Sequence, residues 1–351
     1  MTKTTRVMLA VLALCGTSAA LAQSSVTLYG RVNTSIESQK LGNQSVSGMV
    51  SNSSYVGFRG VEDLGSGLKA GFILETQFNS DDGSGAGGAG IDFTRNSEVN
   101  LAGSFGTVRL GTFDPASYLA TADVVSMHNH DTGTTADALY WYNDSTANKI
   151  AYVTPDFGGV TAELQYSLGE KAIAGGLQDR GAWDLGINYS AGALGVGFGY
   201  STQNKKLAAG TGPKASKDQM AVRVSYALGD LTLAGYYMRG QDETDPTFLG
   251  LKKKIDTYRL SAMYTLGASE FHANIGRANK TKIGSTSIAQ SSATQWTLAY
   301  NYNLSKRTKA YAMYSKVSNG NASSYGPTSL GGAVGAGQDF RTFGLGVRHL
   351  F

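Results

Sequence analysis

The residues that could do chemistry in this chain are few, and they are not arranged as an active site. The run His128-Asn129-His130-Asp131 combines imidazole and carboxylate groups, which are metal ligands, but no cysteine accompanies it, so we favour a hydrated loop. No G-x-S-x-G nucleophile motif occurs, and the glycine-rich run 83–90 lacks the Lys-Ser/Thr ending of a phosphate-binding loop. We therefore expect a protein that is not an enzyme and that holds no metal or cofactor.

One acidic segment is the most informative charge pattern. Residues 114–147 contain five carboxylates and no Lys, Arg or Glu. The segment is also far longer than the roughly 15 residues beyond which loops are uncommon unless they have a function. A functional loop is therefore predicted here, with the aspartates Asp114, Asp123, Asp131, Asp137 and Asp144.

The elements that would position these charges are strands with two unlike faces. In residues 24–37, Val26, Leu28, Val32 and Ile36 share one parity, and mostly polar residues share the other. The same alternation recurs in 69–79, 160–166, 183–189, 296–302 and 343–349. A soluble sandwich would bury the apolar faces and would use strands of about five or six residues. A membrane barrel would turn them toward lipid, and this is the interpretation that we favour.

The connections between these strands alternate in length. Short links such as 190–193, 228–230 and 267–269 take turns with long polar loops such as 39–53, 80–91, 240–253 and 319–338. About 16 strands result, and a strand of about 10 residues tilted near 45° spans roughly 23 Å, which matches an outer-membrane apolar band. The chain is therefore predicted to be all-β, a 16-stranded antiparallel transmembrane β-barrel. Aromatic residues near strand ends suit interfacial girdles: Tyr29, Trp183, Tyr189, Tyr226, Tyr264, Trp296 and Tyr302.

The N-terminus has the pattern of an export signal. Lys3 and Arg6 precede an apolar run, and Ala20-Leu21-Ala22 supplies a cleavage site, so residues 1–22 are predicted to be a signal peptide and residues 23–351 one barrel domain. The only cysteine lies in this leader, where the preceding Leu14 disfavours a lipoprotein site. With 30 basic and 26 acidic residues the charge is nearly balanced, which argues against nucleic-acid binding. No later apolar run approaches the roughly 18 residues of a membrane helix.

Several segments resemble the general diffusion porins of Gram-negative bacteria, particularly the betaproteobacterial branch. They are SSVTLYGRV at the mature start, VGFRGVEDLGSGLKAGFILE at 56–75, FTRNSEVNLAGSFGTVRLG at 93–111, NKIAYVTPDFGGVTAELQYSLGE at 148–170, NLSKRTKAYAMYS at 303–315 and GVRHLF at the end. The resemblance implies an outer-membrane homotrimer for passive, size-limited diffusion of small hydrophilic solutes. It also implies that the third loop, 114–147, folds inward, and that terminal Phe351 is read by the outer-membrane assembly machinery.

The strand parities then suggest which charges line the channel. The expected basic residues are Arg31, Arg59, Lys69, Arg109 and Lys149, and the expected acidic residues are Glu75, Glu98, Asp114, Asp123, Asp131 and Asp137. Bases on one wall and acids on the other would produce a transverse field that favours polar solutes. A simpler interpretation stays open, because arginines can pair with wall carboxylates and loop aspartates often cap turns.

The sequence also departs from the family pattern at two positions. The family often carries Arg where Tyr55 and Thr112 stand here, so the sign of ion selectivity is not predicted. Two other functions remain as alternatives to a general channel. One is a solute-specific channel, and the other is a barrel with a structural or adhesive role.

Overall fold

The computed structural model describes residues 25–85, 90–125, 138–141, 147–169, 178–206, 214–245, 251–327 and 330–351. The predicted signal peptide, residues 1–22, lies outside these ranges. In the described part of the chain, no helix is both long enough and apolar enough to cross a membrane.

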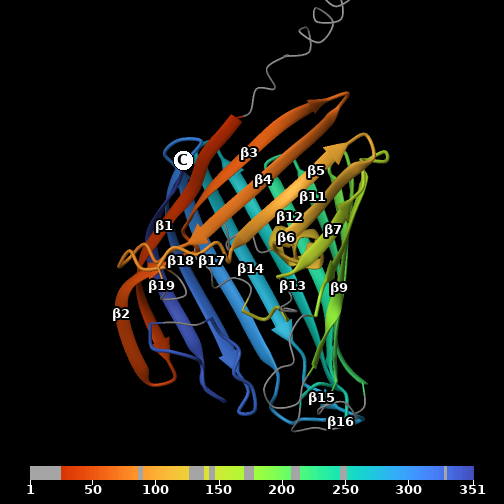
Figure 1. Ribbon diagram of the computed structural model, residues 1–351. Coiled ribbons are helices and arrows are strands. Elements are labelled where there is room, and N and C mark those ends of the chain that lie inside the picture. The colour runs from red at the N-terminus through yellow and green to blue at the C-terminus, as the bar shows by residue number, and fades with distance from the viewer. Residues whose placement is uncertain are drawn as a thin grey trace, which may run out of the picture.

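The described residues form one closed antiparallel sheet (Figure 1). β2 and β3 both pair with β1 and together serve as one interrupted strand. β15 and β16 form a small hairpin at the long-loop end, so 16 strands make up the barrel, as predicted. The strands are β1 (Ser25–Leu41), β2 (Gln44–Ser51), β3 (Tyr55–Gly65), β4 (Leu68–Gln77), β5 (Asn96–Gly103), β6 (Gly106–Thr112), β7 (Lys149–Val153), β8 (Val160–Ser167), β9 (Gln178–Ala191), β10 (Leu194–Lys206), β11 (Lys214–Leu228), β12 (Leu231–Asp242), β13 (Lys253–Leu266), β14 (Ser269–Ala278), β15 (Lys282–Ile283), β16 (Thr286–Ser287), β17 (Ala293–Asn303), β18 (Thr308–Asn319) and β19 (Phe340–Leu350).

Short turns gather at one end of this barrel and long loops at the other. The two-residue turns that join β9 to β10, β11 to β12 and β13 to β14 each begin with a glycine at positive φ, such as Gly229 at +60°. Glycine adopts this conformation without the strain that a side chain would bring, and such turns match the twist of paired strands. The barrel thus has one end with short turns and one end with long loops, as the lengths of the connections predict.

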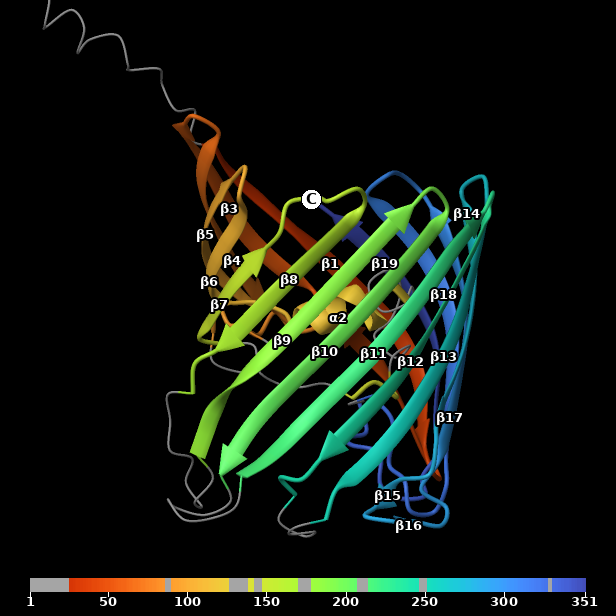
Figure 2. The same cartoon turned by 90° about the vertical axis from the view of Figure 1, so that its right-hand side faces the viewer.

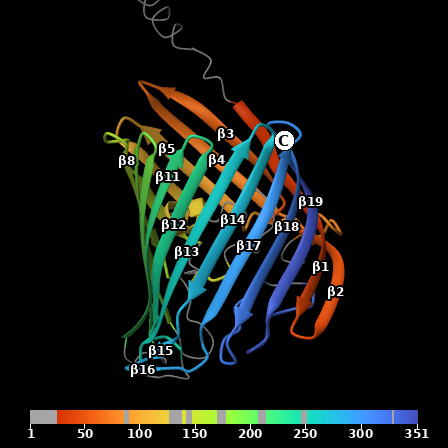
Figure 3. The same ribbon diagram turned by 180° about the vertical axis from the view of Figure 1, so that it is seen from behind.

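The burial pattern is the reverse of that in a soluble protein. On β1, outward Ile36 is 65% exposed, whereas its inward neighbour Glu37 is only 1% exposed. Leu260, Leu298 and Leu345 are likewise exposed on the outer wall. No second sheet of the described chain covers this apolar surface, as Figures 1 and 3 show from opposite sides. Lipid is therefore the partner of the apolar parity, and the soluble sandwich is excluded.

Aromatic side chains occupy the outer wall near the strand ends, with one exception to the prediction. Trp183, Tyr226 and Trp296 are exposed there. Tyr29, in contrast, faces the lumen, where its hydroxyl donates to Glu75 Oε1 at 2.6 Å. The prediction that Tyr29 belongs to the interfacial girdle is wrong, because it shares the inward parity of Arg31.

The barrel closes where the first strand, β1, pairs with the last strand, β19 (Figure 3). The backbone N–H of Gly30 donates to the carbonyl of Phe351, and the N–H of Phe351 donates back to Gly30, each at 3.1 Å. A Cβ at position 30 would strike the ring of Phe351, so glycine is needed for this approach. The last residue of the chain therefore completes the seam between β1 and β19.

Candidate functional site: the lumen of the barrel

The described parts of the long loop lie within the barrel, against its inner wall (Figure 2). Helix α2 (Ala116–Ala120) contacts β8 to β11, and helix α3 (Ala122–Val125) contacts β11 to β13. Ser117 fixes the start of α2, because its backbone N–H and its hydroxyl donate to the two carboxylate oxygens of Asp184 on β9 at 2.7 and 2.6 Å. Arg223 on β11 fixes the end of α2 by donating to the carbonyl of Ala120 at 2.9 Å.

Glycines on the inner wall make room for α2. A Cβ at Gly197 on β10 would collide with the carbonyl oxygen of Ala120, and one at Gly199 would collide with Ser117. Gly186 on β9 is placed in the same way against Ala116. The missing side chains let the helix backbone lie directly on the strands, which a lumen-facing residue of ordinary size would prevent.

An apolar cluster inside the lumen holds further described parts of the loop. Tyr140 packs edge-to-face against Tyr118 and Tyr236, with ring centres 5.6 and 6.0 Å apart. The Tyr140 hydroxyl accepts from Gln219 at 2.8 Å, and burial raises the pKa of this phenol, so it stays protonated. Val125 and Met238 complete the same cluster. The described parts of the loop are therefore packed on the β9–β13 wall as a small core of their own.

A ladder of guanidinium and phenol groups lines the inner face of β1, β3 and β4. The guanidinium of Arg59 lies 4.9 Å from the ring centre of Tyr29, whose hydroxyl binds Glu75. Arg95 Nε lies 3.0 Å from Glu75 Oε2, and its guanidinium lies 4.5 Å from the ring of Tyr55. The same ring is approached by Arg31 at 5.4 Å, and Arg31 also donates to the carbonyl of Ser53. Stacking on aromatic rings holds the arginines in place while keeping their charge.

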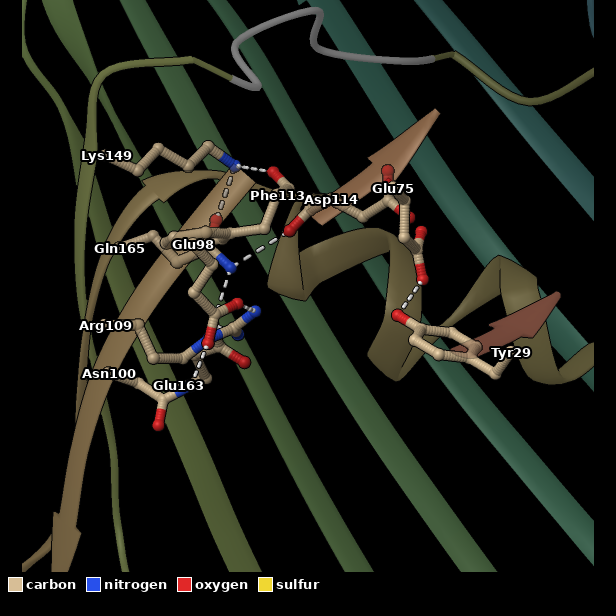
Figure 4. Close-up of polar contacts among 10 residues, drawn as sticks. All are labelled: Tyr29, Glu75, Glu98, Asn100, Arg109, Phe113, Asp114, Lys149, Glu163 and Gln165. Atoms are coloured by element: carbon tan, nitrogen blue, oxygen red, sulfur yellow. Dashed lines mark hydrogen bonds and ion pairs between the residues drawn. The ribbon is translucent and has the colours of Figure 1, made fainter. Parts of the chain in front are cut away.

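Arg109 on β6 is neutralised by two carboxylates (Figure 4). Its Nη2 lies 2.6 Å from Glu98 Oε2, and its Nη1 lies 2.6 Å from Glu163 Oε1. The side chain of Glu98 is only 3% exposed and also accepts from Asn100 at 2.8 Å. Arg109 therefore pairs with carboxylates of the wall, as the simpler interpretation of the arginines expects, and these carboxylates compensate its charge.

Lys149 on β7 contacts the start of the loop (Figure 4). Its ammonium donates to the carbonyl of Phe113 at 3.0 Å and to Gln165 Oε1 at 2.6 Å. Gln165 in turn donates to the backbone carbonyl of Asp114 at 3.1 Å. Lys149 is buried, so its contacts tie the loop to the wall.

The remaining predicted residues are spread over the barrel. Lys69 has the inward parity of Glu75 but sits six residues nearer the short-turn end, roughly 20 Å along the strand. The Asp114 side chain is exposed, and Asp123 on α3 is half-buried. Asp131, Asp137, Asp144 and the run 128–131 lie outside the described residues.

Sequence reasoning missed several lumen residues besides Arg223, among them Arg95, Glu163 and Asp184. Arg95 directly precedes β5 and places a cation over Tyr55, close to the position where the family pattern has its own arginine. Glu163 and Asp184 both stand on the polar parity of their strands, and that parity was the signal that could have found them. The parity does not show which groups Glu163 and Asp184 bind.

Comparisons with known proteins agree with this arrangement. Residues 9–322 match the model of a family described as Gram-negative porin. The chain is 34% identical to outer membrane porin protein 32 of Delftia acidovorans, over 99% of this chain and 100% of that protein. It is 27% identical to an outer membrane porin protein of Bordetella pertussis, over 95% and 96% of the two chains.

Solved structures resemble it as well. An anion-selective porin from Comamonas acidovorans superposes with a TM-score of 0.79 at 30% identity, covering 94% of this chain and 100% of that one. OmpT of Vibrio cholerae in its trimer form shares the fold at 17% identity, with a TM-score of 0.68. The chain thus belongs to the Gram-negative porin family and is an outer-membrane porin, a water-filled barrel through which small hydrophilic solutes diffuse.

Proposed function

We propose that the loop 114–147 forms the constriction of this porin and that Arg31 and Arg59 supply the charge that selects ions there. The observation that carries the proposal is the position of α2 and α3 on the inner face of β9 to β13. The inner face of β1 and β3 carries the arginines, so the two groups of residues come from different parts of the wall. Solutes then pass between an aspartate-bearing loop and an arginine-bearing wall.

The described contacts show what each wall cation lies against. Arg109 and Arg95 are each within 3.0 Å of a carboxylate, so their charges are largely compensated. Arg59 approaches the phenol ring of Tyr29, and Arg31 approaches the ring of Tyr55 and donates to the carbonyl of Ser53. We propose that these two give the channel a preference for anions, which the similarity to a solved anion-selective porin also supports.

Planar-bilayer recording tests this function. Purified protein should give large, stable conductance that does not saturate with salt, and its reversal potential in a KCl gradient should show a preference for chloride. Block of the KCl current by one solute at low concentration would instead favour a solute-specific channel. Absence of any conductance would favour a structural or adhesive barrel.

We also propose that the protein is a homotrimer and that Phe351 is recognised during outer-membrane assembly. A trimeric solved structure of the same fold supports the first point. The seam contact between Phe351 and Gly30 gives the terminal residue a structural role as well. Gel mobility of the detergent-extracted protein before and after heating tests the trimer. The Phe351→Ala variant tests recognition: it should fold from urea into detergent yet accumulate poorly in the outer membrane.

A further inference from the structure

Two guanidinium groups lie on the part of the inner wall where the loop packs. Arg223 on β11 and Arg259 on β13 have the inward parity, and both are buried, with only 5% and 1% of their surfaces exposed. Helix α3 contacts both of these strands, and α2 contacts β11. This is not the part of the wall that carries Arg31 and Arg59, so the selectivity proposed above does not yet include its charges.

Neutral oxygens hold Arg223 in place. Its Nε donates to the carbonyl of Ala120 at 2.9 Å, its Nη1 to the hydroxyl of Ser225 at 3.0 Å, and its Nη2 to Asn188 Oδ1 at 3.2 Å. The side chain crosses β10, where a Cβ at Gly197 would come within 2.7 Å of Nε. Asn188 and Ser225 are half-buried, so this guanidinium lies at the edge of the open lumen.

Neutral oxygens hold Arg259 as well. Its Nη2 donates to Gln295 Oε1 at 2.7 Å, its Nη1 donates to Asn274 Oδ1, and its Nε donates to a tyrosine hydroxyl of β12 at 3.3 Å. A Cβ at Gly276 would lie 3.3 Å from this guanidinium and 3.3 Å from a methyl group of Leu139. The guanidinium and the loop residue Leu139 therefore lie together over the same glycine.

The charges of these two arginines are not compensated nearby. Among the described residues, no carboxylate forms an ion pair with either guanidinium. On β9, Asp184 stands four residues from Asn188, roughly 13 Å along the strand, and accepts from the start of α2. On β14, Glu270 stands equally far from Asn274 and lies 2.9 Å from the ammonium of Lys309.

A charge held in the wall still acts on the passage beside it. The effective dielectric constant of a protein is lower than that of water, so the potential of a buried guanidinium falls off less steeply than that of a solvated one. Walls of low dielectric constant also focus the field into a narrow aqueous passage. Because both guanidinium groups lie behind the loop, their potential offsets that of the loop aspartates Asp114 and Asp123.

We propose that Arg223 and Arg259 are specificity-determining residues, which make the wall behind the loop positive and thereby favour small anions. The inference rests on the proposed function and extends the anion preference of Arg31 and Arg59 to a second part of the wall. Arg223 contributes more, because it lies at the edge of the open lumen. Solutes do not bind to either arginine but pass through the potential that the two produce.

Adding a carboxylate beside each arginine gives the sharpest test. Asn188→Asp and Asn274→Asp keep an oxygen acceptor for Arg223 and Arg259, so the size limit for sugars in liposome swelling should stay that of the parent. In a KCl gradient, the permeability ratio of chloride to potassium should fall by at least about twofold in Asn188→Asp and by less in Asn274→Asp. Gln241→Glu, the same change of amide to carboxylate on the outward parity of β12, is the matched control and should leave the ratio unchanged.

Direct substitution separates the charge of Arg223 from its hold on the loop. Arg223→Gln removes the charge and should lower the permeability ratio, as Asn188→Asp does. Arg223→Lys keeps the charge but cannot form all three hydrogen bonds, and it should keep the ratio of the parent. A residue that only held α2 in place would give the same ratio in the lysine and glutamine variants.

The outcomes separate this proposal from the channel function. An unchanged ratio in Asn188→Asp would overturn the role of Arg223, and an unchanged ratio in Asn274→Asp would overturn that of Arg259, while the channel would stand. Equal ratios in Arg223→Gln and Arg223→Lys would likewise overturn the proposal. Conductance without a preference for chloride in the parent would refute the anion preference itself, and absence of conductance would refute the diffusion function.

Discussion

Ser117 of the lumen helix α2 donates both its backbone N–H and its hydroxyl to the carboxylate of Asp184 on β9. The two hydrogen bonds measure 2.7 and 2.6 Å, and both residues are buried. Hydrogen bonds to a charged group contribute about 1.5–3 kcal/mol. The carboxylate of Asp184 on the wall therefore fixes the point at which the long loop enters the channel.

Removing that carboxylate should loosen the loop. In Asp184→Ala the two donors of Ser117 lose their acceptor, so α2 docks less firmly and the passage widens. Liposome swelling with sugars of increasing size should show a higher size limit than in the parent. Asp156→Ala, in an exposed turn outside the lumen, is the control and should leave the limit unchanged. An unchanged limit in Asp184→Ala would show that this contact does not hold the constriction.

Adding a methyl group under α2 should have the opposite effect. In Gly197→Ala the new Cβ collides with the carbonyl of Ala120, so α2 must move from the wall toward the pore axis. Single-channel conductance in KCl should fall. Gly235→Ala is the matched control, because Gly235 faces outward and its Cβ would meet the Leu260 side chain and the backbone carbonyl oxygen of Arg259, away from α2. Equal conductance in both variants would contradict the docked position of α2.

Neutralising the two ring-stacked arginines should change ion selectivity. Arg31→Gln/Arg59→Gln removes two lumen cations while leaving the loop aspartates in place, so the reversal potential in a KCl gradient should move toward that of potassium. Lys316→Gln/Arg341→Gln removes two cations from the outward parity of β18 and β19 and should leave the reversal potential unchanged. If the Arg31/Arg59 variant also gave no movement, both arginines would lie outside the selective region.

The Arg109 network should matter for stability more than for selectivity. Arg109→Met leaves Glu98 and Glu163 without their cation, and an uncompensated buried charge costs about 3–5 kcal/mol, less here because Arg109 and Glu163 are partly exposed. Urea unfolding in detergent should show the loss. Adding Glu98→Gln and Glu163→Gln should recover much of it, since the buried charges are then gone. Failure of this triple variant to recover would mean that packing by Arg109 outweighs its charge.

A charge on the outer wall should destabilise the barrel. Leu345→Arg places a cation in the apolar band of β19 and should destabilise the barrel by about 2–4 kcal/mol, seen as a lower unfolding temperature. Thr107→Arg, on the inward parity of β6 that Arg109 shares, should cost much less. Equal tolerance of both substitutions would contradict the assignment of faces.

The faces of the wall could be predicted from sequence because strand geometry is strictly periodic. The parity of Arg31, Arg59 and Glu98 follows from counting residues, and the structure places all three on the inner side. The same count also gave Tyr29 its inward side, yet its residue type suggested a girdle. The parity of Tyr29 in the strand determines that it faces the lumen, because one residue cannot face both lipid and lumen.

The order of the strands and the length of the long loop were likewise set by the sequence, since alternation and turn signals are local properties. The partners of each charge depended on tertiary structure. Whether an arginine meets a phenol, as Arg59 does, or two carboxylates, as Arg109 does, depends on which strands are neighbours and at what register. Residues distant in sequence, such as Ser117 and Asp184, meet only when the barrel has closed and the loop has entered it, and no local pattern encodes that contact.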